Sequence, residues 1–176
     1  MSVVSILLVY TKKNLDDNIK TIEYIITKSE KTYLLNYGDD DFSDYNYFHI
    51  TKTEKIFSEI NKILIANTDF DIHILDFNII PQQPNYLEIF EQHCSLNNNS
   101  VCVGSLVYDD NDCGDSILFS SGNKLITREN YFYGDSKINY GQCLSAFVKS
   151  ETKEIDSVDY FFFYIPQEVV KQQILF

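Results

Sequence analysis

Two side chains that can act as oxygen ligands stand two positions apart in the stretch HILDFNIIP. Asp76 ends an apolar run, and Asn78 follows after a single phenylalanine. Carboxylate and amide oxygens suit Mg²⁺ or Mn²⁺, and such a cation can offset the negative charge of a diphosphate. The alternative is that both residues only end a strand, because Asp and Asn favour turns by bonding their own backbone.

Two other polar segments also follow apolar runs. YTKKN begins with Tyr10 and Thr11, and GDDDFSD includes Asp39 and Asp40. In an open parallel sheet, ligands bind beyond the carboxyl ends of the strands, where such loops converge. We therefore expect these two segments and Asp76 to meet in space. The alternative interpretations of GDDDFSD are a solvated acidic loop and a weak cation site that lacks the spacing of a calcium loop.

Strands alternate with helices over the first hundred residues, and these elements must position the polar segments. Apolar, branched runs predict strands over VVSILLVY, KTYLLNY, YNYFHI and DIHILDF. Apolar residues at helical spacing predict a helix after TKKN, another over residues 53 to 66, and a third that begins at Pro84. The stripes of the first two helices are Leu15, Ile19, Ile22 and Ile26, and Ile56, Ile60, Ile63 and Leu64.

Beyond residue 100 the pattern changes to short strands separated by turns. VCVGSLVY, SILFSS, KLITR and QCLSAFVKS are strand-like and show little helical periodicity. The chain therefore predicts a single α/β domain over residues 1–176. Its open sheet is parallel in the first half and mixed in the second, with helices on both faces.

Charge and hydropathy exclude several classes of partner. The 26 acidic and 14 basic residues give a net charge of -12, which repels nucleic-acid backbones and anionic lipid. The apolar start MSVVSILLVY lacks a basic region before it and a cleavage site after it, so it predicts a core strand and not a signal peptide. No stretch approaches the roughly 20 apolar residues of a membrane span. We expect a cytoplasmic protein.

Cysteine and histidine residues do not indicate a metal site. Cys94, Cys102, Cys113 and Cys143 form no C-x-x-C pair and have no histidine cluster nearby, so they predict reduced, buried thiols. His73 alternates with apolar neighbours and predicts a core imidazole with its hydrogen bonds satisfied.

Six segments, taken in their order, carry a resemblance to a known family. They are VVSILLVYTKKN, TYLLNYGDDDFSD, FSEINKILIANTDFDIHILDFNIIPQQPNYLEIFEQH, VCVGSLVYDDNDCGDSILFSSG, GQCLSAFVKSE and FFFYIPQEV. Together they resemble the family 2 glycosyltransferases, which bind nucleotide sugars on the fold called GT-A. In that family a strand ends in Asp-x-Asp, and here Asp76 matches the first acidic position. The third position is Asn78, which lacks the charge and lowers the expected metal affinity.

The resemblance implies roles for further residues. Glu168 follows the aromatic run where the family has its catalytic base, which takes the proton of the acceptor hydroxyl. Asp159 and Asp156 are the next candidates for this role. A weakly held Mg²⁺ or Mn²⁺ would bind to Asp76 and Asn78. The residues implied for nucleotide or donor binding are Tyr10, Thr11, Asp39, Asp40, Asn61, Asp76 and Asn78.

Two functions of different classes follow from the resemblance. The first is a glycosyltransferase-like enzyme that moves a sugar from a nucleotide-sugar donor to an unknown acceptor. The second is a catalytically inactive GT-A protein, a pseudoenzyme that binds a nucleotide sugar or serves as an interaction subunit. The aromatic run Phe161 to Phe163 is expected to be either part of the core or the interface through which such a subunit would associate with a second copy or another chain.

Overall fold

The computed structural model describes most of the first hundred residues and a short C-terminal segment. The described ranges are 2–79, 81, 84–96 and 162–172, together with the backbone of strands at 103–104, 107–109, 117–120, 124–128 and 131–135. The chain forms two compact units, one of Met1–Val103 with Phe161–Phe176 and one of Gly104–Tyr160. In the described ranges, no helix combines the length and apolar composition that crossing a bilayer requires.

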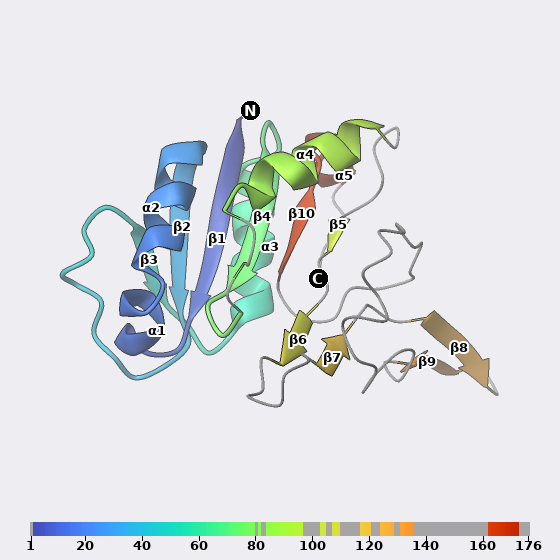
Figure 1. Ribbon diagram of the computed structural model, residues 1–176, viewed down its shortest axis with the longest axis horizontal. Helices are drawn as coiled ribbons and strands as arrows, with labels where there is room; N and C mark the ends of the chain where they lie inside the picture. Colours follow the sequence, from blue (N-terminus) through green and yellow to red (C-terminus); the bar gives the residue numbers. More distant parts are fainter. Residues whose placement is uncertain are drawn as a thin grey trace. The chain divides into compact units, whose positions relative to one another are not determined.

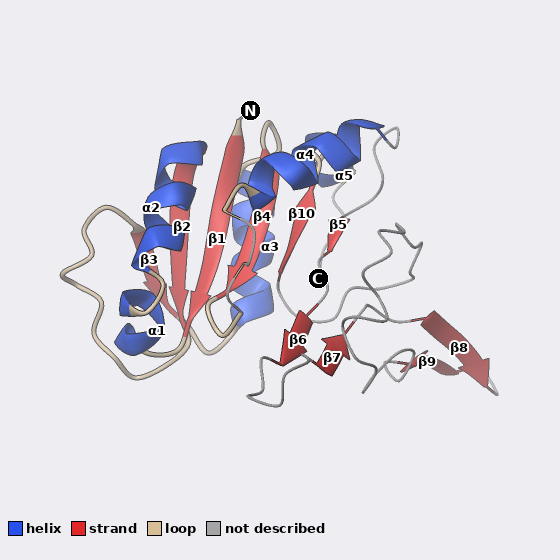
Figure 2. Ribbon diagram, viewed as in Figure 1, coloured by secondary structure: helices blue, strands red, loops and turns tan. Residues whose placement is uncertain are grey.

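The first unit is built on an open, mixed sheet (Figures 1 and 2). Its strand order is β3-β2-β1-β4-β10-β5. The pairs β1–β2, β1–β4 and β2–β3 are parallel, whereas β10 runs antiparallel to β4. This confirms the α/β class and a sheet that is parallel first and mixed later. The strands are β1 (Val3–Val9), β2 (Ser29–Asn36), β3 (His49–Lys52), β4 (Asp71–Asp76), β5 (Val103–Gly104) and β10 (Phe162–Ile165).

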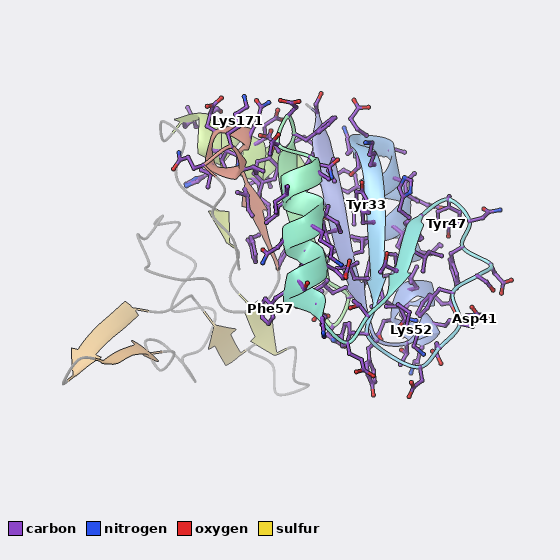
Figure 3. The ribbon with its side chains drawn as sticks, turned by 180° about the vertical axis from the view of Figure 1, so that it is seen from behind. Tyr33, Asp41, Tyr47, Lys52, Phe57 and Lys171 are labelled. Atoms are coloured by element: carbon purple, nitrogen blue, oxygen red, sulfur yellow. The ribbon has the colours of Figure 1, made fainter. Side chains whose placement is uncertain are left out.

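Helices cover both faces of this sheet, as the sequence predicts. α2 and α4 lie on the face that is in front in Figure 1, and α3 lies on the face that is in front in Figure 3. The helices are α1 (Lys12–Asp16), α2 (Ile19–Lys28), α3 (Ile56–Ala66), α4 (Tyr86–Leu96) and α5 (Gln167–Val170). The central strand β1 is thus buried from both sides, which explains its nearly continuous apolar run, whereas the edge strand β3 is largely exposed.

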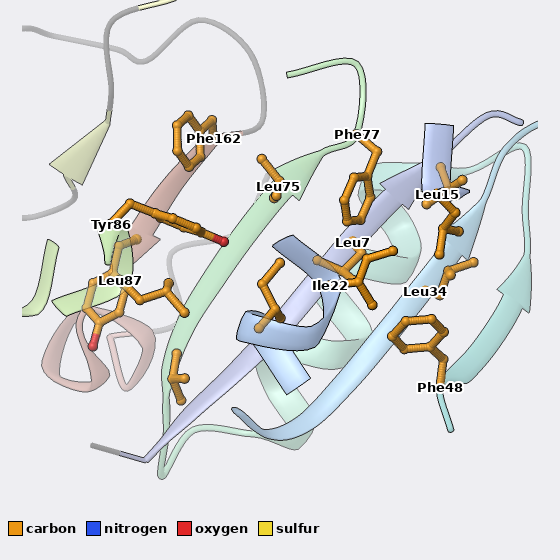
Figure 4. Packing of buried hydrophobic residues seen from close by; sticks show 14 of the residues in the cluster. Leu7, Leu15, Ile22, Leu34, Phe48, Leu75, Phe77, Tyr86, Leu87 and Phe162 are labelled. Atoms are coloured by element: carbon orange, nitrogen blue, oxygen red, sulfur yellow. The ribbon is translucent and has the colours of Figure 1, made fainter. Parts of the chain in front are cut away.

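One cluster of the core lies between α2, α4 and the sheet (Figure 4), and residues of α3 are buried as well. All seven residues of β1 are buried, and Leu7 packs in one cluster with Ile22, Leu34 and Phe77. Complete burial of one such aliphatic or aromatic side chain contributes about 1.5–3 kcal/mol. The strands that end in the polar segments are therefore held rigidly in register.

The helix predicted after the first strand is broken in two. The chain turns at Asn18, which is buried and donates from Nδ2 to the Asn14 carbonyl oxygen over 2.8 Å. The predicted stripe is therefore only partly right. Leu15, Ile22 and Ile25 are buried, whereas Ile19 is 47% exposed and Ile26 is 37% exposed.

The aromatic run near the C-terminus is part of the core. Phe162 and Phe163 are each 5% exposed, and β10 pairs with Phe162 opposite Leu75. The two rings therefore belong to a strand of the sheet and not to a free surface. Of the two expectations for this run, the core position is observed for Phe162 and Phe163. Phe161 lies outside the described residues.

The second unit contains two antiparallel strand pairs. β6 (Val107–Asp109) pairs with β7 (Ile117–Ser120), and β8 (Lys124–Arg128) pairs with β9 (Tyr131–Asp135). The strands predicted within SILFSS and KLITR are confirmed, and β9 is an additional strand. The predicted strand QCLSAFVKS lies outside the described residues.

Candidate functional site

The carboxyl ends of three parallel strands bring the three polar segments together. In the register of the sheet, Val9 of β1 lies opposite Asn36 of β2, and Leu8 lies opposite Asp76 of β4. The next residues remain bonded, because Tyr37 N donates to the Val9 carbonyl over 3.1 Å and Phe77 N donates to the Leu8 carbonyl over 3.0 Å. The predicted meeting of these loops is confirmed.

Asp76 is surrounded by hydrogen-bond donors. Its Oδ1 accepts from the backbone N of Asn78 over 2.9 Å and from Asn78 Nδ2 over 2.8 Å. Its Oδ2 accepts from the Tyr37 hydroxyl over 3.4 Å, and that hydroxyl in turn accepts from Asn78 Nδ2 over 2.9 Å. The three side chains form a closed triangle between β2 and β4, which we call the Asp76 triangle.

A fourth residue joins the Asp76 triangle to the first loop. Asn14 Nδ2 donates to Asn78 Oδ1 over 3.5 Å. Asn14 Oδ1 accepts from the backbone N of Thr11 over 3.1 Å and from its hydroxyl over 2.6 Å. Thr11 caps α1 in return, because its hydroxyl accepts from Asn14 N. Thr11 therefore positions Asn14, and its hydroxyl is already used within the protein.

The acidic loop after β2 is anchored to the protein at several points. Asp40 Oδ2 accepts from Lys12 N over 2.7 Å, and its carbonyl accepts from Asn36 Nδ2 over 2.7 Å. Phe42 is only 2% exposed. The solvated-loop interpretation therefore holds only for the carboxylates and not for the whole loop. Asp39 is exposed and lies 3.8 Å from Lys52 Nζ.

Two tyrosines form an aromatic pair at the same edge. The ring centroids of Tyr10 and Tyr37 are 5.4 Å apart, and the ring planes are tilted by 39°. Tyr10 is 52% exposed, so one part of its ring contacts Tyr37 and the other part faces solvent. Such a ring offers a planar surface on which another planar group can stack.

The surroundings of the Asp76 carboxyl and of the Tyr37 hydroxyl favour the protonated form of each group. Burial raises the pKa of the Asp76 carboxyl, even though the hydrogen bonds from Asn78 and Tyr37 act in the opposite direction. Burial and the nearby Asp76 charge raise the pKa of the Tyr37 hydroxyl to about 12. A perturbed carboxyl at a loop junction is typical of functional sites.

The donor set around Asp76 does not fit a divalent cation. Asn78 presents its N–H groups to Asp76 and directs its oxygen to Asn14, so it offers no oxygen ligand beside the carboxylate. In the part of the chain that the structure describes, no three His, Cys, Asp or Glu side chains gather at one point. A cation prefers several oxygen ligands, and Asp76 supplies the sole carboxylate of the triangle.

Two candidate residues are not brought to this edge. Asn61 lies in the middle of α3, on the sheet face opposite to α2. Glu168 lies in α5, which follows the end of β10, where Ile165 pairs with Ile72 near the start of β4. Since β4 has six residues at about 3.3 Å each, Glu168 lies at the opposite edge of the sheet from Asp76.

Glu168 has other neighbours at that edge. Its carboxylate lies 3.8 Å from Lys171 Nζ, and Gln167 N donates to Asp71 Oδ1 over 2.6 Å. A base must come within hydrogen-bond reach of the acceptor hydroxyl. Glu168 therefore does not share a site with the Asp76 triangle. Asp156 and Asp159 lie outside the described residues.

Sequence reasoning missed two members of the site. Tyr37 is the last residue of the run KTYLLNY, and its position at a strand end could have identified it. Asn14 stands three residues after Thr11, a spacing typical of a capping box, but that pattern does not indicate a contact with Asn78.

His73 and Cys94 belong to the core. His73 is fully buried, and its Nδ1 lies 3.1 Å from Ser5 Oγ, while Nε2 has no hydrogen-bond partner among the described residues. The predicted core imidazole is confirmed, although only one of its nitrogens is satisfied. Cys94 is buried, as predicted, and the other three cysteines lie outside the described residues.

Comparison with protein-family models and with curated proteins finds no match to this chain.

Proposed function

We propose that this chain is a glycosyltransferase-like protein that binds a nucleotide sugar beside the Asp76 triangle. The observation that carries the proposal is the contact between three loops distant in sequence. Tyr37, just beyond β2, and Asn78, just beyond β4, both donate to the Asp76 carboxylate, and Asn14 of α1, in the segment after β1, donates to Asn78. In open α/β sheets this edge is where ligands bind.

The sheet and the aromatic pair support the same proposal. Parallel strands followed by an antiparallel one agree with the GT-A arrangement that the resemblance implies. The half-exposed ring of Tyr10 provides a surface for a nucleobase, backed by Tyr37. Stacking of one base on an aromatic side chain contributes about 1–3 kcal/mol in proteins that bind single-stranded nucleic acids.

Sugar transfer and binding without transfer are separate outcomes of this proposal. Transfer requires a proton acceptor near the donor, and Glu168 lies at the other edge of the sheet. This placement favours the pseudoenzyme, in which the site binds a nucleotide sugar without moving the sugar. Asp76 is the carboxylate at the site, so any transfer or donor hydrolysis should disappear in Asp76→Ala.

Thermal unfolding with UDP, GDP and their sugars tests the proposal. A ligand that binds only the native state raises the melting temperature by mass action. We expect a rise with at least one nucleotide, and a roughly 5- to 150-fold weaker affinity in Tyr10→Ala. Each titration is run with Mn²⁺, with Mg²⁺ and with a chelator. Release of free nucleotide from the donor sugar, measured in parallel, separates transfer or hydrolysis from binding.

Tyr47→Ala is a matched control for Tyr10→Ala. Tyr47 is 50% exposed, against 52% for Tyr10. It precedes the amino end of β3, whereas Lys52 marks the carboxyl end of that strand (Figure 3). The control should bind nucleotide as the wild type does. Absence of any shift with all nucleotides, or equal losses in both variants, would contradict the proposal.

A further inference from the structure

We propose that the side-chain amide of Asn78 takes the place of a divalent cation beside Asp76, so that this site binds its ligand without a metal. The proposal concerns the mode of binding and, for the identity of the ligand, rests on the proposed function. It reverses the expectation that Asp76 and Asn78 together hold Mg²⁺ or Mn²⁺.

The neighbours of Asn78 determine which way its amide points. Asn14 Oδ1 accepts from the backbone N of Thr11, a group that can only donate, so Asn14 must turn Nδ2 toward Asn78. Asn78 then has to receive that donor with its oxygen. Its Nδ2 is thereby directed to Asp76 and Tyr37, as the contacts of 2.8 and 2.9 Å show.

Donors of Asn78 occupy the positions beside Asp76 Oδ1 that a cation would need. Two N–H donors of Asn78 reach Oδ1 at 2.8 and 2.9 Å, and the Tyr37 hydroxyl reaches Oδ2. Hydrogen bonds to an ionised acceptor are about twice as strong as neutral ones. A metal ion on Oδ1 would have to displace Nδ2, which would also break the bonds of Asn78 to Tyr37 and Asn14.

The nearest acidic loop does not supply a second ligand. Asp40 already accepts from the backbone N of Lys12 over 2.7 Å, and this bond joins the first two loops. The Asp39 carboxylate is fully exposed beside Lys52. A cation at Asp76 would therefore have one protein carboxylate as a ligand and would depend on water or on the phosphate oxygens of a bound ligand for the rest of its coordination shell.

Asn78→Asp tests the proposal directly. This change removes the Nδ2 donor and places a second carboxylate next to Asp76, which restores Asp-x-Asp. We expect Asn78→Asp to bind Mn²⁺ at least about tenfold more tightly than the wild type, because added ligand charge raises affinity. Binding is measured by Mn²⁺ electron paramagnetic resonance and by the Mn²⁺-dependent rise in melting temperature.

Thr53→Asp is a matched control for the added charge. Thr53 lies just beyond the carboxyl end of β3, and its hydroxyl accepts from Lys55 N over 2.9 Å, a bond that an Asp side chain can also make. This control should bind Mn²⁺ as weakly as the wild type does. An equal gain in both variants would mean that net charge alone attracts the ion, and would overturn the proposal.

Mn²⁺ binding to the wild-type chain is a second test that can refute the proposal. Mn²⁺ binding by the wild type that disappears in Asp76→Asn would overturn it, whether or not Asn78→Asp folds. Where a nucleotide binds, its affinity in the wild type should be unchanged by a chelator. If no nucleotide binds at all, the proposed function fails, while the Mn²⁺ measurements still decide this inference.

Discussion

Gly38 lies so close to Tyr10 that a Cβ atom at Gly38 would be 1.7 Å from the Tyr10 carbonyl oxygen. The backbone N of Gly38 also donates to Asn36 Oδ1 over 2.9 Å. The loop after β2 can therefore lie against the end of β1 only because residue 38 has no side chain. This close approach brings the Tyr10 and Tyr37 rings into contact.

Gly38→Ala should destabilise the protein by at least about 2 kcal/mol, because the new methyl group meets backbone that no rotamer change can move away. The free energy of unfolding in urea measures the loss. Asp39→Ala, at the next and exposed position, is the control and should change it by less than about 0.5 kcal/mol. Equal effects of the two changes would contradict the close approach.

Asp76→Asn should make the protein slightly more stable at pH 7, by less than about 1 kcal/mol after allowance for solvent screening. Burial raises the pKa of this carboxyl above its ordinary 3.8, so the fold favours the protonated form. That contribution is present below pH 3.8 and is lost as the pH rises through the folded pKa. Asn resembles the protonated acid, so its advantage should shrink toward pH 3 in urea titrations. A constant difference at both pH values would contradict this assignment.

His73 should dominate the loss of stability in mild acid. Burial lowers its pKa from 6.5 to about 3, so the fold holds the neutral imidazole. Its contribution is complete above pH 6.5 and is lost as the pH falls toward 3, at up to about 1.4 kcal/mol per pH unit. The wild type should therefore lose stability more steeply between pH 6 and 4 than His73→Gln does. His49→Gln, at an exposed position, is the control and should keep the wild-type slope.

Asp71→Asn should destabilise the protein by about 1–3 kcal/mol, because one carboxylate joins the C-terminal segment to β4. Asp71 Oδ2 accepts from the Tyr164 hydroxyl over 2.6 Å, and Oδ1 accepts from Gln167 N over 2.6 Å. An Asn side chain can accept only one of these bonds. Urea unfolding measures the change, with the exposed Asp69→Asn as control. Equal stability of both variants would show that these two bonds contribute nothing.

The sequence alone predicts the parallel half of the sheet and the meeting of its loops. Branched apolar runs identify β1, β2 and β4, and parallel strands that end in polar residues must place those residues at one edge. The sequence therefore suffices to place Asp76 at the same edge as the segment that contains Tyr10 and Thr11.

Local periodicity did not predict the features of the fold that depend on contacts between elements. The side-chain bond from Asn18 to the Asn14 carbonyl breaks the first helix and moves Ile19 and Ile26 to the surface. The aromatic sequence of β10 is compatible with a parallel or an antiparallel strand. Its antiparallel pairing with β4 could therefore not be predicted. That direction is what carries Glu168 to the far edge of the sheet.

The amino-acid order determines that Asp76 ends a buried strand next to Asn78, since this follows from apolar patterning and turn chemistry. Only the folded chain decides that the Asn78 amide faces the carboxylate, because its direction depends on Asn14 and Thr11, which are more than sixty residues away in sequence. Hydrogen bonds between distant loops have no local signature, and here they determine whether the site offers a metal ligand or a donor.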